Sequence, residues 1–98
     1  MTQCAAVDLA PFGIRVNAVN PGVVMTELQK RGGQDEETYA KFIERSINVT
    51  HPMGAALGRV ADPTEVAELI AFLSGNKSLF ITGDSIKIDG GRGCVGAR

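Results

Sequence analysis

The chain has 98 residues, with ten basic and eleven acidic side chains, a formal net charge of −1 and a hydrophobic content of 44%. This composition is typical of one small globular domain and excludes a disordered chain. The balanced charge, without a basic stripe, argues against a nucleic-acid partner, and no apolar run approaches the roughly 18 residues that a membrane-spanning helix needs.

The two cysteines, Cys4 and Cys94, lie near opposite ends of the chain, and there is one histidine. We interpret the cysteines as free thiols in a reducing compartment, although their number also allows one disulfide. With no CxxC pair and a single histidine, the sequence supports no metal site. The first residues lack the features of a signal peptide, so we expect a cytoplasmic protein.

Residues 1–10 are predicted to form the last turns of a helix that Pro11 and Gly13 end. No N-cap signal precedes this helix, so we expect that upstream sequence is missing. A mitochondrial location therefore stays open beside the cytoplasmic one, because a targeting segment would lie in that upstream sequence.

Residues 14–20 are predicted to form a buried strand, because β-compatible apolar side chains dominate them. Pro21 has no N–H and should end regular pairing, and Gly22 lets the backbone bend and approach another group. Ligands of open α/β sheets lie just beyond the carboxyl ends of parallel strands. This Pro-Gly turn, together with the hydroxyl of Thr26, is therefore a candidate ligand-contacting loop, with a purely structural turn as the alternative.

The middle of the chain contains a predicted amphipathic helix over residues 35–48, with Asp35 as its N-cap. It can be a helix of the core or a mobile cover over a site, since Gly32-Gly33 precedes it. Residues 49–61 are predicted to be irregular because they contain several Pro and Gly residues. His51 is interpreted as a solvated side chain without a partner or a catalytic role.

The most clearly marked helix covers residues 63–74. Asp62 is its predicted N-cap, Pro63 occupies the first helical position, and Glu65 completes a capping box. A short strand follows within residues 81–88, and Asp89-Gly90-Gly91 turns the chain out of it. We expect this strand and the strand at 14–20 to be parallel neighbours joined through the 63–74 helix.

Residues 91–96 match the pattern G-x-G-x-x-G after a strand, which resembles a dinucleotide fingerprint. That motif requires its glycines to open a helix whose N-terminus holds the pyrophosphate. Only two residues follow it in this sequence, so we reject it as a phosphate loop and interpret it as a tail.

Three segments together resemble the C-terminal half of the short-chain dehydrogenase/reductase family, and in particular its 3-oxoacyl-ACP-reductase-like members. They are DLAPFGIRVNAVNPGVVMT (8–26), LGRVADPTEVA (57–67) and ITGDSIKIDGG (81–91). The resemblance implies an α/β fold, the C-terminal part of a doubly wound Rossmann-type parallel sheet with two strands and flanking helices. It makes residues 1–98 a partial domain of that type, with residues 27–61 as a substrate-lid-like insertion. Residues 53–57 depart from the family pattern as a short insertion.

The resemblance also implies an NAD(P)-dependent oxidoreductase that moves a hydride between the cofactor, NAD or NADP, and an alcohol or carbonyl substrate. It carries four cofactor-binding positions over to this chain: Pro21, Gly22, Val24 through its backbone, and Thr26 through its hydroxyl. It carries over no catalytic residue. The family's Tyr-x-x-x-Lys pair is absent, because the only tyrosine is Tyr39 and position 43 is Ile.

Two functions remain in view. The first is the nicotinamide- and substrate-binding part of such an oxidoreductase, expected to be inactive alone. The second is a non-catalytic binding or oligomerisation fragment that pairs with a full-length relative. For either one the resemblance implies a homo-oligomer that forms through the 63–74 helix and the last strand, and we expect no nucleic acid or membrane as partner.

Overall fold

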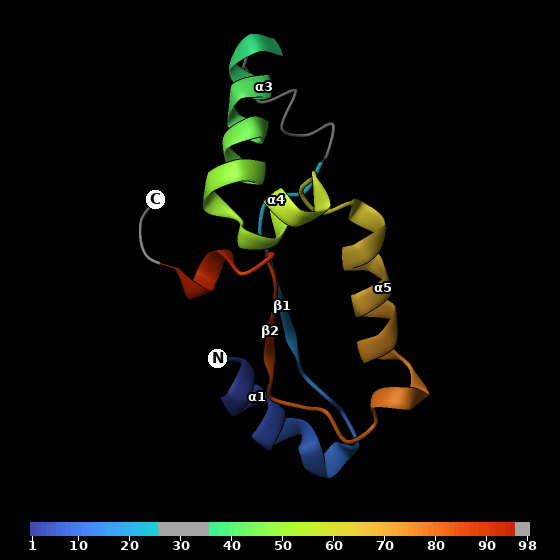
Figure 1. Cartoon of the computed structure of the whole chain (residues 1–98). Coiled ribbons are helices and arrows are strands. Elements are labelled where there is room, and N and C mark those ends of the chain that lie inside the picture. Colours follow the sequence, from blue (N-terminus) through green and yellow to red (C-terminus); the bar gives the residue numbers. More distant parts are fainter. Residues whose placement is uncertain (26–35, 96–98) are drawn as a thin grey trace.

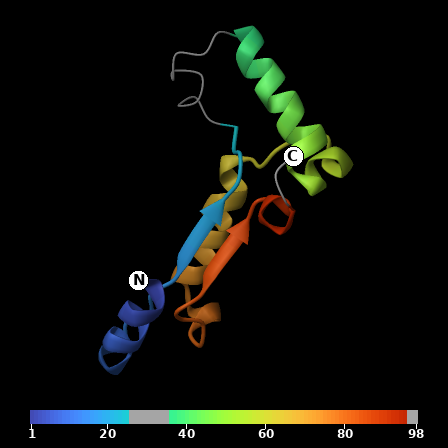
Figure 2. The same ribbon diagram turned by 90° about the vertical axis from the view of Figure 1, so that its left-hand side faces the viewer.

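The structure is a computed structural model that describes residues 1–25 and 36–95. Its centre is a two-stranded parallel sheet of β1 (Ala18–Pro21) and β2 (Ser85–Ile88), which lie side by side in Figure 2. The register runs from Ala18 opposite Ser85 to Pro21 opposite Ile88. The predicted α/β class and the parallel pairing are therefore confirmed.

Pro21 ends β1 without disturbing the ladder. The N–H of Ala18 donates to Asp84 O (2.9 Å) and the N–H of Gly22 donates to Ile88 O (3.2 Å). Since N–H groups alternate sides along a strand, the nitrogen of Pro21 faces away from β2, where a missing N–H costs no hydrogen bond. The prediction that regular pairing ends at Pro21 is confirmed.

The strand is shorter at its start than the predicted range of 14–20. Regular pairing begins only at Ala18. Before it one backbone hydrogen bond remains, from the N–H of Gly83 to Val16 O (2.8 Å), and side chains take the neighbouring ones. The N–H of Val16 donates to Thr82 Oγ1 (3.0 Å), and the amide of Asn17 donates to Ile81 O (3.0 Å) and accepts from the N–H of Asp84 (3.1 Å). Residues whose hydrogen bonds involve side chains in this way do not lengthen the strand.

Helix α1 (Thr2–Leu9) precedes the sheet and continues into a 3₁₀ turn, Ala10–Phe12. Gly13 ends it with φ = 74°, a left-handed conformation that a side chain would strain. The predicted helix and its stop are confirmed. The helix packs against the loop before β2, where the Cβ of Ala6 lies close to Gly83.

Helix α5 (Pro63–Ser74) connects the two halves of the molecule and lies along one face of the sheet (Figure 1). Its predicted capping box is present: Asp62 accepts from the N–H of Thr64, and Glu65 accepts from the N–H of Asp62. A 3₁₀ turn, Asn76–Ser78, follows the helix. The predicted range and caps of this helix are confirmed.

Helix α3 (Glu36–Arg45), a π-helical turn (Ser46–Thr50) and α4 (Pro52–Leu57) lie beyond the carboxyl ends of the strands (Figure 1). The predicted N-cap Asp35 lies outside the described residues. The prediction of an irregular segment over 49–61 is wrong, because Pro52 opens α4 and Gly58, at φ = 73°, ends it. Pro at the first helical position and Gly just past the end are a helix signal in themselves.

Gly54 allows α4 to fold back on the π-helical turn. A Cβ at this position would lie 2.6 Å from Ile47 O and 2.9 Å from Ile47 Cα, so any side chain would push the two segments apart. The N–H of Met53 donates to Gly90 O (2.9 Å), which ties the start of α4 to the end of β2. Helix α4 is thus fixed to the sheet at the edge where a ligand would lie.

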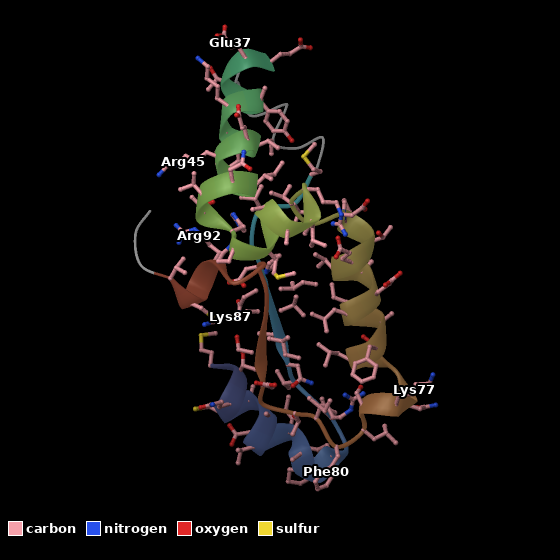
Figure 3. All side chains as sticks on the ribbon, viewed as in Figure 1. Glu37, Arg45, Lys77, Phe80, Lys87 and Arg92 are labelled. Atoms are coloured by element: carbon pink, nitrogen blue, oxygen red, sulfur yellow. The ribbon has the colours of Figure 1, made fainter. Side chains whose placement is uncertain are left out.

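The described chain is elongated, with a radius of gyration of 16.3 Å, against about 13 Å for a compact domain of this length. Few of its described apolar side chains are buried: Ala6, Tyr39, Val60 and Leu73. Large apolar side chains remain exposed, among them Ile70 and Phe72 on α5 and Phe80 at the lower tip in Figure 3. Much of the apolar surface therefore lacks cover within the described residues.

Two further predictions concern the surface. Cys4 and Cys94 are exposed free thiols, as interpreted from the sequence. No helix in residues 1–25 and 36–95 is long and apolar enough to cross a membrane. The rejected glycine motif forms a 3₁₀ turn at Arg92–Cys94 in its described part, and Gly96 lies outside the described residues.

Candidate functional site

The candidate site is the turn at the carboxyl end of β1, where Gly22 passes between two other segments. A Cβ on Gly22 would lie 2.8 Å from His51 Nε2 and 3.0 Å from Asp89 Cα. Only glycine fits this close approach without displacing one of these neighbours. The predicted role of Gly22, to let the backbone come close to another group, is borne out, although the group is part of the protein itself.

Beyond Gly22 the chain makes an isolated parallel bridge between Val24 and Ala61. The N–H of Ala61 donates to Val23 O (3.3 Å), and the N–H of Met25 donates to Ala61 O (3.0 Å). These contacts use the carbonyl before Val24 and the amide after it, so both peptide units that flank Val24 are fixed in orientation.

The N–H and C=O of Val24 consequently point away from Ala61. The described chain has no cis peptide bond, and in a trans peptide the carbonyl and the amide point to opposite sides. Val23 O and Val24 N–H share one peptide, and Val24 O and Met25 N–H share the next. Val24 therefore presents one donor and one acceptor on the side of the turn that faces away from Ala61.

Of the four predicted cofactor-binding residues, the structure brings Pro21, Gly22 and Val24 together in this turn. Thr26 lies outside the described residues, so its role stays a prediction. Tyr39, which the sequence excluded as a catalytic tyrosine, is 7% exposed, and its hydroxyl contacts Met25 Sδ at 3.7 Å. Tyr39 thus packs α3 against the residue that follows the bridge.

The interpretation of His51 as a solvated residue without a partner is wrong. The imidazole is 6% exposed, and Nε2 accepts from the N–H of Val23 (3.2 Å). On its other side Nδ1 lies 3.1 Å from Ser46 O and 2.7 Å from Thr50 Oγ1. No local pattern could reveal this, because Val23 is 28 residues away in the sequence.

A cavity of about 80 Å³ lies behind the turn. It is lined by side chains from the turn, α4, the start of α5 and the end of β2, among them Val23, His51, Met53, Val60 and Asp89. At its rim Arg59 and Glu65 form an ion pair. The N–H of Asp62 and the Arg59 guanidinium both donate to the Glu65 carboxylate, and they lower its pKa.

Asp89 organises the turn that leaves β2. Its carboxylate accepts from the N–H of Gly91 (3.0 Å) and of Gly93 (2.9 Å). Desolvation raises the pKa of Asp89, but the hydrogen bonds from Gly93 and Gly91 and the nearby charge of Lys87 outweigh it and lower the pKa. Asp89 is therefore a carboxylate at neutral pH, and its oxygens already accept hydrogen bonds from the backbone. Residues 1–25 and 36–95 contain no cluster of three groups that could hold a metal ion.

The parallel strands, the helical connection between them and the glycine turn at the carboxyl edge define a Rossmann-type α/β protein. Residues 1–92 match the family model described as enoyl-(acyl carrier protein) reductase. This chain belongs to the short-chain dehydrogenase/reductase family.

Individual relatives agree with this assignment. The chain is 43% identical over 95 residues to a diacetyl reductase ((S)-acetoin forming) of Staphylococcus epidermidis, a match that covers 92% of this chain and 35% of that protein. It is 34% identical over 90 residues to a cyclopentanol dehydrogenase of Comamonas, covering 92% of this chain and 32% of that protein. The chain thus spans about a third of the length of the curated relatives it matches.

A solved structure also superimposes well. A short-chain dehydrogenase/reductase of unknown function from Caenorhabditis elegans, determined with its cofactor, gives a TM-score of 0.81 at 37% identity. The match covers 97% of this chain and 35% of that chain. The fold described above is therefore the fold of this family over nearly the whole of the present sequence.

Proposed function

We propose that this chain supplies the nicotinamide-facing part of an NAD(P)-dependent oxidoreductase that acts on a small alcohol or carbonyl compound. The observation that carries the proposal is the orientation of Val24. A nicotinamide carboxamide needs one acceptor and one donor, and the C=O and N–H of Val24 offer that pair on the side of the turn away from Ala61. The residues present therefore fit the cofactor that the family uses.

Each residue of the turn has a separate task in this proposal. Pro21 ends the strand, Gly22 lets the backbone lie close against its neighbours, and Val24 holds the carboxamide. The hydroxyl of Thr26 donates to an oxygen of the cofactor. When bound, NAD(P) supplies or accepts the hydride, and the fixed peptides of the turn orient its ring.

The helices beyond the carboxyl ends of the strands form the cover of the substrate in this proposal. Tyr39 joins α3 to Met25, and Met53 joins α4 to Gly90, so the insertion at 27–61 contacts both strand ends. A cover attached at these points lies next to the turn that holds the cofactor, where it can exclude water from the reaction.

The present sequence contains no Tyr-x-x-x-Lys pair, so in this proposal the proton transfer comes from residues outside it. General acid–base catalysis contributes about 10²–10⁴-fold in rate, and cofactor positioning contributes further. The 98-residue chain alone is therefore proposed to be inactive. The exposed thiols Cys4 and Cys94 fit a reducing compartment such as the cytoplasm.

A second role is pairing with another subunit, either a copy of the same protein or a full-length relative. Its support is helix α5, on which two large apolar side chains stay exposed: Ile70 (49%), which lines a groove with Val19 of β1, and Phe72 (45%), which lies on a different side of the helix. Within residues 1–25 and 36–95 no further strand pairs with β2, so its outer edge offers backbone groups to a partner, and these side chains offer apolar area. We base the proposal of a homo-oligomer that forms through α5 and β2 on this observation.

The proposal is tested in a chimaera in which this chain replaces the matching segment of the Staphylococcus epidermidis diacetyl reductase. We expect the chimaera to bind NADH or NADPH and to reduce diacetyl, and the isolated chain to show no turnover. Val24→Pro removes the N–H that the bridge does not use and should abolish cofactor binding, while Val24→Ala keeps the N–H and should retain it. Equal cofactor affinity of the two variants would overturn the proposal.

A further inference from the structure

His51 is the one histidine of the chain, and the chemistry proposed above makes no use of it. It lies buried between the turn after β1 and the π-helical turn Ser46–Thr50. We propose that His51 is a positioning residue that holds the turn in the shape in which Val24 faces the cofactor, and that it does so only as a neutral imidazole. That His51 holds the turn follows from its contacts alone, while the link to the cofactor rests on the proposed function.

The partners of the ring define its protonation state. The N–H of Val23 can only donate, so Nε2 must present a lone pair to it. Ser46 O can only accept, so Nδ1 must carry the hydrogen that points to it. Both contacts require the same neutral tautomer, and Thr50 Oγ1 is close enough to accept from the same Nδ1–H.

The imidazole of His51 binds the one backbone polar group of Val23 that Ala61 does not bind. The carbonyl of this residue accepts from the N–H of Ala61, and its N–H donates to His51. With both ends held, the peptide that carries the Val24 N–H has one orientation. Gly22 adds a steric part, since a Cβ there would lie 2.8 Å from Nε2.

A protonated imidazole cannot make this contact. It carries hydrogens on both nitrogens, so its Nε2–H would face the N–H of Val23. The hydrogen bond between them would be lost, and the turn would no longer be fixed by the ring. The charged groups around the ring are engaged elsewhere. Arg59 and Glu65, at the start of α5, pair with each other, and Asp89, after β2, accepts from Gly91 and Gly93. Ser46, Thr50 and Met53, from the segments on the other side, carry no charge.

The contact is measured directly by NMR in the ¹⁵N-labelled chimaera, where the rest of the domain is present, through the scalar coupling across the N–H···N bond between Val23 and His51. We expect a cross-peak between Val23 N and His51 Nε2 at neutral pH and a ring spectrum typical of the Nδ1–H tautomer. In acid, where both ring nitrogens carry hydrogens, the cross-peak should be lost and the amide signals of Val23 and Val24 should shift. Absence of the cross-peak at neutral pH would overturn the inference without any variant being needed.

Two variants separate positioning from simple packing. Glutamine can present its carbonyl oxygen to the Val23 N–H and gains no hydrogen on that oxygen in acid, so His51→Gln should keep the Val23 amide protected from hydrogen exchange both at neutral pH and in acid. His51→Leu fills the space without an acceptor and should raise the exchange rate of Val23 at least tenfold. Equal protection in the leucine variant would show a role in packing only and would overturn the inference.

Addition of NAD⁺ to the same samples distinguishes this inference from the proposed function. A cross-peak between Val23 and His51 with no NAD⁺-induced shift at Val24 would support the positioning of the turn and count against the cofactor role of Val24. An NAD⁺-induced shift at Val24 without that cross-peak would support the cofactor role and overturn the role of His51.

Discussion

The guanidinium of Arg15 donates from Nη1 to the carbonyl of Leu73 at 2.7 Å, across 58 residues of sequence. The same group reaches Gly75 O through Nη2 at 3.2 Å, and Ser78 Oγ donates to Leu73 O at 3.1 Å. Arg15 therefore binds the carbonyls at the C-terminal end of α5, where the helix dipole favours a positive charge. It joins the segment before β1 to the helix that covers the sheet.

Arg15→Met should destabilise the chain by about 2 kcal/mol, because hydrogen bonds from a charged donor contribute about 1.5–3 kcal/mol. Methionine keeps much of the apolar stem and removes the donors. Arg15→Lys should recover part of the loss, since an ammonium can reach only some of these carbonyls. Urea unfolding of the three proteins at one concentration measures the difference, and equal midpoints for wild type and Arg15→Met would contradict the assignment.

Gly22→Ala should disturb the turn more than a surface substitution would. The added methyl group meets His51 Nε2 at 2.8 Å and Asp89 Cα at 3.0 Å, so the ring or the backbone must move. Overpacking of this kind typically costs about 1–3 kcal/mol. The expected result is a lower unfolding midpoint together with faster hydrogen exchange at Val23.

Gly75→Ala is a matched control, because its Cβ would lie 3.3 Å from Ala71 O and 3.7 Å from Phe72 O, both farther than the neighbours at Gly22, and its φ of −94° suits any residue. It should change both readouts less than Gly22→Ala. If the two variants behave alike, the close approach at Gly22 does not constrain the turn.

Stability should fall at acid pH through the capping box of α5. The pKa of Asp62 is lowered from its usual 3.8, chiefly by the hydrogen bonds from Thr64, and that of Glu65 from its usual 4.5, chiefly by the N–H of Asp62. A carboxyl with a lower pKa in the folded state stabilises it above the unfolded value. This contribution is complete above about pH 5 and is lost as the pH falls through the folded pKa values.

Thermal unfolding between pH 7 and pH 2.5 measures this dependence. Asp62→Asn with Glu65→Gln keeps uncharged acceptors in the box and should flatten the curve below pH 5. A residual slope is expected, because the pKa of Asp89 is lowered as well. An identical slope in the double variant would mean that the capping box does not titrate with folding.

The sequence-based predictions were correct where the interacting residues are close in the sequence, and they failed where those residues are far apart in it. The capping box was predicted correctly because Asp62 and Glu65 are three positions apart. Helix α4 was missed although Pro52 and Gly58 marked its two ends, because its glycine content was taken as a loop signal. The burial of His51 had no local signal, since it depends on the Val23 amide and on the close approach at Gly22.

Thr26→Val tests the predicted site residue that lies outside the described structure. The substitution keeps the shape and removes the hydroxyl, so in the chimaera it should weaken cofactor binding by about 0.5–1.5 kcal/mol, or roughly two- to twelvefold in Kd. Thr26→Ser keeps the hydroxyl and should bind cofactor nearly as well as the wild-type chimaera. Unchanged affinity in the valine variant would reduce Thr26 to a structural residue.

The isolated chain should not be a stable monomer. A sheet of two strands is rarely stable alone, and parallel strands normally have both faces covered. Only four apolar side chains in the described residues are buried, whereas Ile14, Ile70 and Phe72 each expose more than two fifths of their surface. We therefore expect the isolated chain either to associate, which buries this apolar surface, or to unfold readily.

Sedimentation velocity and denaturant unfolding at two protein concentrations measure this. We expect species larger than a monomer, or a broad transition at low denaturant whose midpoint rises with protein concentration, because association stabilises the folded form by mass action. Ile70→Glu with Phe72→Lys replaces the two exposed apolar side chains of α5 by charges and should shift the distribution toward monomer. Val7→Glu on α1 is the control, at an apolar position that is more exposed still (73%). A monomer with a sharp, concentration-independent transition at high denaturant would show that the uncovered surface needs no partner.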